Sequence, residues 1–279
     1  AHLVDYSGKL AIGTAQWGLD YGVTNTSGRL PDSVISDFLH TMRNHEITHL
    51  DTAASYGDSE KRIGHLDTTG MQIQTKLSAK DTTTDLLVTA LHQSLDRLRT
   101  SKVDSLLIHD WFALNQIEMQ EVSGFFEVAI NNELTNHVGI SAYALADLEH
   151  AQAKLAVWDT AQIPINALDQ RFVGAANSFP QIAFQARSIF LQGLLLSDSS
   201  THPDVVAFHQ CAAEIDTDPL TLSLGYIKTQ SWLDSVVIAP TTPIEFDQIM
   251  ASLNTELPSF EFGSLTSTDM QLMDPRTWG

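Results

Sequence analysis

The sequence has few basic residues, a single cysteine and no long hydrophobic run. Its 279 residues include 34 aspartates and glutamates but only 15 lysines and arginines, which gives a formal net charge of −19. Nucleic acids and anionic membrane surfaces bind clusters of positive charge, so this balance argues against both as partners. No stretch approaches the roughly 18 apolar residues that a membrane-spanning helix requires. We therefore expect no nucleic-acid partner and no membrane partner.

Further absences narrow the chemistry and the compartment. The lone Cys211 excludes an internal disulfide and is typical of a reducing compartment. Residues 1–10 lack the basic start and apolar core of a secretion signal, so a cytoplasmic location is expected. No His-x-His pair follows the first predicted strand, which argues against a metal hydrolase, and we expect no metal site. A monomer and a small homo-oligomer both remain open.

Eight short hydrophobic segments alternate with helical patterns along the chain. Their nearly continuous apolar character is typical of strands buried on both faces of a parallel sheet. The alternation predicts an α/β fold, a closed (β/α)8 TIM barrel, formed by residues 1–279 as a single domain. An open doubly wound sheet would need a glycine-rich G-x-G-x-x-G segment after its first strand, where this chain reads IGTAQWG. The predicted strands span residues 9–15, 48–53, 71–77, 104–110, 137–143, 161–167, 186–192 and 235–241.

Polar side chains follow neighbouring predicted strands at their carboxyl ends, where active sites of such barrels lie. Asp51 ends the second strand with Tyr56 just beyond it, Lys76 ends the third, and His109 ends the fourth. Each of the last three could alone be an ordinary structural residue. Together they form a constellation, because a buried lysine needs a counter-ion and Asp51 is the natural one. We expect the Lys76 charge to lower the pKa of Tyr56 from about 10 towards the working range.

This cluster predicts acid catalysis on a carbonyl group. Tyr56 would donate a proton to the carbonyl oxygen, and a neutral His109 would hydrogen-bond the same oxygen. A Schiff-base aldolase that uses Lys76 is a weaker alternative, because Asp51 would keep the lysine charged rather than nucleophilic.

The chain also resembles the aldo-keto reductases. The motifs IGTAQWG, LDTAASYGDSEKRIG, QTKL, LLIHD, HVGISAY, QIPINALDQR and LQGLL occur in that family's order and cover almost the whole chain. The resemblance implies a (β/α)8 barrel that binds NAD(P)H across the strand ends without a Rossmann motif. It implies hydride transfer between nicotinamide C4 and the carbonyl of a small-molecule aldehyde or ketone, sugars included. The family's catalytic residues fall on Asp51, Tyr56, Lys76 and His109.

The same resemblance implies cofactor contacts, with two departures from the family pattern. Ala142 stands where the family often has an asparagine, and Arg187 stands where it commonly has an aromatic residue that stacks on the nicotinamide. A guanidinium plane can also stack. The LQGLL segment resembles the loop that places backbone N–H groups against the pyrophosphate. The implied contacts are Thr14, Ser141, Gln162, Arg187, Gln192, Gly193, Ala239 and Thr241.

The segment after the eighth predicted strand bears on the choice of cofactor. Residues 239–249 contain no arginine or lysine, and Glu245 and Asp247 add negative charge. A 2′-phosphate normally receives a charge-assisted hydrogen bond from a basic side chain. The sequence therefore favours NADH over NADPH.

Aromatic residues on the loops after the first and fourth predicted strands are candidates for a substrate pocket. These are Trp17, Tyr21 and Trp111. Packing of these side chains over the barrel top is an equally open interpretation. The altered cofactor positions also support an alternative function, a binding or cofactor-sensing protein that keeps the fold but turns over little.

Overall fold

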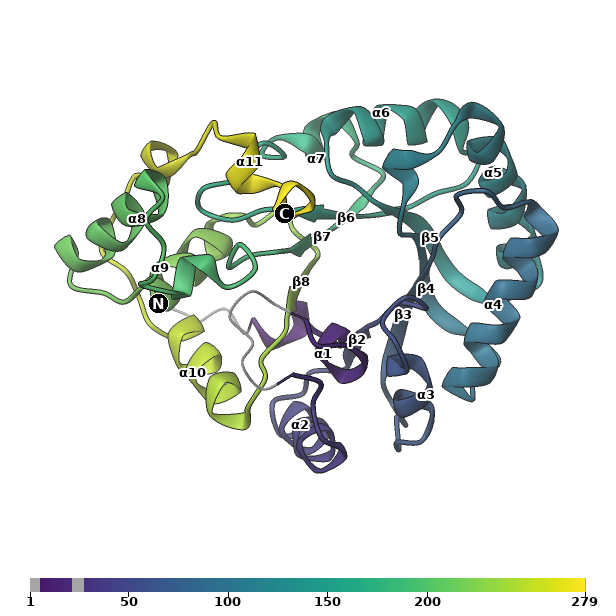
Figure 1. Cartoon of the computed structure of the whole chain (residues 1–279), viewed down its shortest axis with the longest axis horizontal. Helices are drawn as coiled ribbons and strands as arrows, with labels where there is room; N and C mark the ends of the chain where they lie inside the picture. The colour runs from purple at the N-terminus through teal and green to yellow at the C-terminus, as the bar shows by residue number, and fades with distance from the viewer. Residues whose placement is uncertain (1–5, 22–27, 279) are drawn as a thin grey trace.

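The computed structural model describes residues 6–21 and 28–278, and within them eight parallel strands close into a barrel surrounded by helices (Figure 1). Each strand pairs with the next along the chain, and the last pairs with the first. The predicted (β/α)8 barrel is confirmed. The strands are β1 (Leu10–Gly13), β2 (His49–Asp51), β3 (Gln72–Leu77), β4 (Val103–Ile108), β5 (Thr135–Ser141), β6 (Thr160–Pro164), β7 (Ala183–Arg187) and β8 (Ser235–Ile238).

The helices pack their apolar faces against the barrel. In α4, Leu87, Leu91, Leu95 and Leu98 recur at helical spacing and are all buried. The Thr83 side chain caps its first turn. The longer helices are α2 (Asp32–Asn44), α4 (Thr84–Leu98), α5 (Gln116–Asn131), α6 (Leu145–Lys154), α8 (Pro203–Glu214), α9 (Pro219–Thr229) and α10 (Pro243–Leu253). The short ones are α1 (Ala15–Gly18), α3 (Ser59–Gly64), α7 (Ala175–Ser178) and α11 (Met270–Met273).

The parallel register brings the carboxyl ends of the strands to one edge of the barrel. Asp51 lies opposite Gly13 on one side and Gln74 on the other, and Ser141 lies opposite Gln162. Side chains that are far apart in the sequence therefore meet at this edge. Among the helices of the described residues, none combines the length and hydrophobicity that crossing a bilayer requires.

The seventh strand differs from its prediction. The apolar run suggested residues 186–192, but the strand begins at Ala183 and ends at Arg187. Ser188, Leu191 and Gln192 then adopt positive φ angles of 56°, 51° and 57°, which a strand cannot accommodate. The end of the hydrophobic run is thus a loop that packs inwards, with Leu191 buried.

Candidate active site

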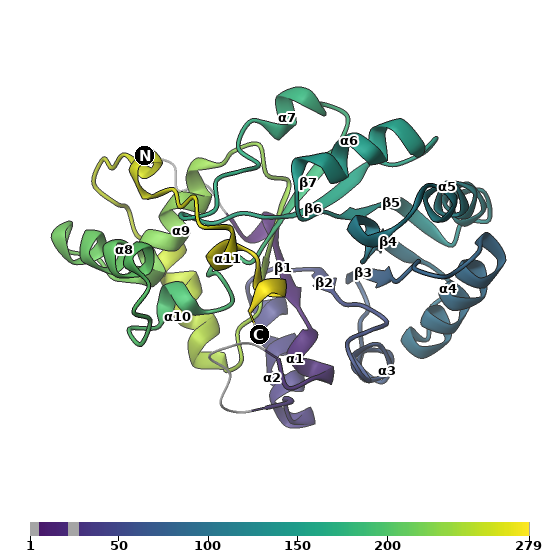
Figure 2. The same ribbon diagram turned by 45° about the horizontal axis from the view of Figure 1, so that its top comes forward.

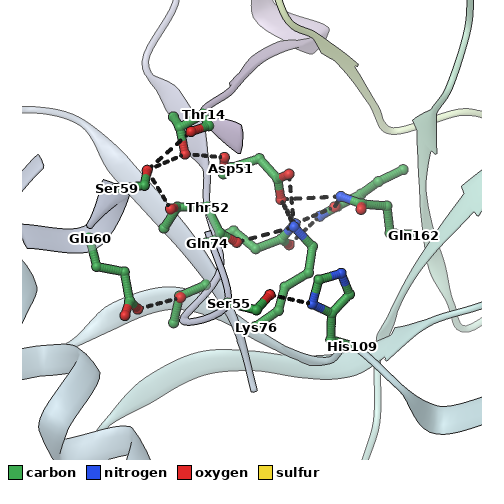
Figure 3. Close-up of polar contacts among 12 residues, drawn as sticks. Thr14, Asp51, Thr52, Ser55, Ser59, Glu60, Gln74, Lys76, His109 and Gln162 are labelled. Carbon is green, nitrogen blue, oxygen red and sulfur yellow. Dashed lines mark hydrogen bonds and ion pairs between the residues drawn. The ribbon is translucent and has the colours of Figure 1, made fainter. Parts of the chain in front are cut away.

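A buried ion pair lies at the carboxyl ends of β2 and β3. Lys76 Nζ donates to both carboxylate oxygens of Asp51, at 2.9 and 2.8 Å, and to the carbonyl oxygen of Thr52 at 3.1 Å (Figure 3). Lys76 is 1% exposed and Asp51 4%. Burial opposes the charged ammonium, but the attraction of Asp51 and of Tyr56 outweighs it and raises the pKa of Lys76. The lysine is therefore charged at neutral pH.

Tyr56 lies beside this pair. Lys76 Nζ is 5.2 Å from the centroid of its ring. Burial raises the pKa of Tyr56 and outweighs the opposing effect of Lys76, so the expected net lowering is wrong. The physical reason is that burial strips water from a phenolate, and the free energy lost in this way exceeds the attraction of the Lys76 ammonium. The phenol is consequently protonated at neutral pH, as a proton donor must be.

The loop that carries Tyr56 is held tightly against the loop after β1. A Cβ on Gly18 would lie 1.8 Å from the carbonyl oxygen of Tyr56, so only glycine fits there. Ser59 Oγ is 3.0 Å from Thr52 Oγ1 and donates to Thr14 Oγ1 at 2.9 Å. Thr14 Oγ1 in turn donates to the backbone oxygen of Asp51 at 2.9 Å. This chain of hydroxyl groups fixes the phenol relative to the ion pair.

His109 follows β4 and faces the same point. Its ring meets that of Tyr56 edge to face, with centroids 5.8 Å apart. Its Nδ1 is 3.2 Å from Ser55 Oγ. Burial and the nearby Lys76 charge lower the pKa of His109 to about 4. The imidazole is therefore neutral at pH 7, as the sequence predicts.

One cavity of about 580 Å³ opens beside these residues. Asp51, Tyr56 and His109 line it, and Lys76 lies behind Asp51. Tyr21, a predicted pocket residue, also lines it, and its hydroxyl accepts a hydrogen bond from Gln192 Nε2 at 2.8 Å. All of the candidate cofactor contacts are in the wall: Thr14, Ser141, Gln162, Arg187, Gln192, Gly193, Ala239 and Thr241.

The other two predicted pocket residues are in the core instead. Trp17 is 1% exposed and Trp111 is fully buried, and neither lines the cavity. The indole N–H of Trp111 donates to the backbone oxygen of Asp147 at 3.0 Å. With its polar atom satisfied in the interior, an indole gains more from burial than from a place on a cavity wall. Their assignment to the substrate pocket is therefore wrong.

The structure adds cavity residues that the sequence did not indicate. Tyr143 contacts two guanidinium groups, with Arg187 4.3 Å and Arg276 3.9 Å from its ring centroid. Arg276 belongs to the C-terminal segment, which folds back towards the barrel (Figure 2). The Asp274 carboxylate accepts hydrogen bonds from Arg276 at 2.9 and 2.6 Å. Arg187 has no carboxylate partner within the described residues; its Nη2 donates to the Ala142 oxygen at 2.7 Å.

The far end of the cavity lies at the N-terminus of α10. Thr241 donates to the Glu245 carboxylate from its backbone N–H at 2.6 Å and from its hydroxyl at 2.8 Å. Glu245 also lines the cavity. A helix N-terminus ordinarily attracts phosphate, but here a carboxylate already uses part of its binding capacity. This end of the cavity is therefore poorly suited to a phosphate group, which the Glu245 carboxylate would repel.

Within the described ranges no group of three or more histidine, cysteine, aspartate or glutamate side chains is arranged to hold a metal ion.

Comparison with known proteins places the chain in a family. The family model described as "Aldo/keto reductase family" matches residues 9–269. The chain belongs to this family. Reduced nicotinamide cofactors are typical of aldo/keto reductases, and the membership supports an oxidoreductase.

Three relatives of this aldo/keto reductase share between 20% and 31% of aligned residues with it. Methylglyoxal reductase DkgB of Escherichia coli O157:H7 is 31% identical over 132 residues, 45% of this chain and 49% of that protein. The match thus spans only about half the length of that relative. A crystal structure of a thermostable aldo-keto reductase is 20% identical, with a TM-score of 0.72 over 92% of this chain and 93% of that one. The aldo/keto reductase of Brucella melitensis is 22% identical, with a TM-score of 0.69 over the same shares. These structures support the fold.

Proposed function

We propose that this aldo/keto reductase reduces a small aldehyde or ketone to an alcohol with NAD(P)H, and that Tyr56 is the general acid. The observation that carries the proposal is the Asp51–Lys76 ion pair beside Tyr56, at the wall of a cavity shared with a neutral His109. A protonated phenol next to a permanent ammonium can release its proton and leave a phenolate that the ammonium stabilises.

Each residue has one task in this mechanism. A nicotinamide cofactor, when bound, would supply the hydride for the carbonyl carbon. Tyr56 donates its proton to the carbonyl oxygen, so hydride and proton together complete the alcohol. Lys76 stabilises the phenolate that remains, and Asp51 holds Lys76. His109, with Nδ1 accepting from the Ser55 hydroxyl, would present Nε2–H to the carbonyl oxygen and orient it.

The cavity wall fits a nicotinamide dinucleotide in its polar groups. Ser141 and Gln162, which line the same cavity as Asp51 and Tyr56, would hold the carboxamide, and Gln192 and Gly193 would lie along the diphosphate. Thr241, with Glu245 beside it, would contact the adenosine ribose.

We infer that NADH is preferred over NADPH. Glu245 accepts hydrogen bonds from Thr241 at the end of the cavity where the 2′-phosphate of NADPH would be expected, and residues 239–249 contain no basic side chain. A ribose hydroxyl can donate to the Glu245 carboxylate, whereas a 2′-phosphate would be repelled by it.

Turnover tests the proposal against the binding-only alternative. Purified protein is mixed with NADH or NADPH and with a panel of aldehydes and ketones, and consumption of the reduced cofactor is followed by absorbance. Methylglyoxal is included because one relative is named for its reduction. The proposal predicts catalytic consumption with at least one carbonyl compound. Cofactor binding without consumption across the panel would favour a sensing protein.

A further inference from the structure

Three glutamine side chains and Asp51 form a polar network inside the barrel. Gln74 on β3 and Gln162 on β6 both direct Nε2 at Asp51 Oδ1, at 2.6 and 3.2 Å (Figure 3). Gln185 on β7 is the third amide. Gln74 is 7% and Gln162 2% exposed, so these are interior groups and each hydrogen bond matters for the stability of the arrangement.

Gln185 links the other two amides across the barrel. It exchanges two hydrogen bonds with Gln74, each 2.7 Å long, although β3 and β7 are not neighbouring strands. Its Oε1 also accepts from Gln162 Nε2 at 3.2 Å. Of the three glutamines, only Gln162 lines the cavity.

The charge on Asp51 dictates how the amides of Gln74 and Gln162 are turned. A carboxylate paired with Lys76 is ionised and can only accept hydrogen bonds. Gln74 and Gln162 must therefore turn their NH₂ groups towards it. The second hydrogen of Gln162 goes to Gln185, so both N–H groups of Gln162 are used inside the protein. Its Oε1, which accepts no hydrogen bond from the described residues, is the atom left for a ligand.

We propose that Gln74 and Gln185 are positioning residues that lock the Gln162 amide, so that the Gln162 side chain offers a ligand an acceptor and no donor. The inference rests on the proposed function, under which the ligand group is the carboxamide of the nicotinamide ring. Its NH₂ can donate to Gln162 Oε1. A ring that carries an acetyl group instead has only an acceptor, which would face another acceptor and leave it unpaired.

Binding of cofactor analogues tests this selectivity. Dissociation constants for NADH and for reduced 3-acetylpyridine adenine dinucleotide are measured by quenching of protein fluorescence, without substrate. We expect wild-type protein to bind NADH at least about 10-fold more tightly, the ratio that corresponds to about 1.4 kcal/mol. In Gln185→Leu one N–H of Gln162 becomes available to the ligand, so the ratio should fall to about 3-fold or less.

Two further variants and a control keep the test decisive. Gln185→Met provides a flexible side chain of similar length in case the leucine variant folds poorly, and Gln74→Leu should lower the ratio by a smaller factor. Thr75→Val is the matched control, because Thr75 lies on the same strand but bonds to Glu60 outside the network. Its ratio should equal that of the wild type.

The outcomes separate the two claims. Equal affinity of wild-type protein for NADH and the analogue overturns the positioning role and leaves the proposed function standing. A Gln185 variant that loses thermal stability but keeps the wild-type ratio also overturns it, because the network would then be structural only. Failure of wild-type protein to bind either of these dinucleotides, and NADPH as well, refutes the proposed function.

Discussion

Removal of the Asp51 charge should destabilise the protein strongly. In Asp51→Asn the Lys76 ammonium would remain 1% exposed without a counter-ion, and its partners would all be neutral: the amide oxygen at position 51, the Thr52 carbonyl oxygen and the Tyr56 ring. Breaking a buried ion pair in this way typically costs about 3–5 kcal/mol. Because both partners are almost fully buried, solvent screening does not reduce this figure. Burial of Lys76 would then be unopposed by Asp51, and its pKa should fall.

Replacement of the lysine should destabilise the protein less than replacement of the aspartate. In Lys76→Met the Asp51 carboxylate would still accept hydrogen bonds from Gln74 and Gln162. Free energies of unfolding in urea at pH 7 would compare the two variants with the wild type and with the double variant Asp51→Asn/Lys76→Met. The double variant should recover much of the Asp51→Asn loss, because no unpaired charge is left. A loss below about 1 kcal/mol in Asp51→Asn would contradict the account of the pair.

Three other outcomes follow from the site. Lys76→Met should shift the pH optimum of alcohol oxidation upwards, because Lys76 lowers the pKa of Tyr56 against the effect of burial. An unchanged pH–rate profile with full activity would make Lys76 purely structural. Thr241→Lys should move the ratio of NADPH to NADH affinity towards NADPH by about 10-fold or more, measured by fluorescence titration at low salt, and an unchanged ratio would place the 2′-position elsewhere. The pKa of His109 is about 4 in the folded protein, below its value in the unfolded chain, so the unfolded chain binds the extra proton between about pH 4 and 6.5. The stability of the wild type should therefore fall on acidification across that range. His109→Gln should flatten this dependence of the free energy of unfolding on pH, measured in urea, and an identical slope would show that another group causes it.

The barrel and the convergence of the candidate catalytic residues could be predicted because both depend on local patterns. Continuous hydrophobic segments mark strands buried on both faces, and the residue that ends each one must lie at a common edge. The strand order alone therefore predicts that Asp51, Lys76 and His109 lie close together. The boundary of β7 could not be predicted this way, because residues 188–192 continue the apolar run while their backbone leaves the strand.

Other features depend on contacts that a local pattern does not encode. Trp17 lies in the short helix α1 and Trp111 in a 3-10 turn after β4, where an indole can pack into the core or face the cavity, and the neighbouring sequence does not distinguish these outcomes. Tyr143 and Arg276 meet only because the C-terminal segment folds back over the barrel edge. The pKa of Tyr56 has the same origin: its direction is decided by burial, which depends on the whole loop packing rather than on the adjacent lysine.

The direct test of the central claim is Tyr56→Phe, measured for both catalysis and cofactor binding. The substitution removes the proton donor and little else, and general acid catalysis typically contributes about 10²–10⁴-fold to a rate. With a carbonyl substrate that the wild type reduces, we expect kcat to fall at least 100-fold while the dissociation constant for NADH changes by no more than about 3-fold, roughly 0.65 kcal/mol. A Tyr56→Phe variant that keeps more than about a tenth of wild-type kcat would contradict the assignment of Tyr56 as the general acid.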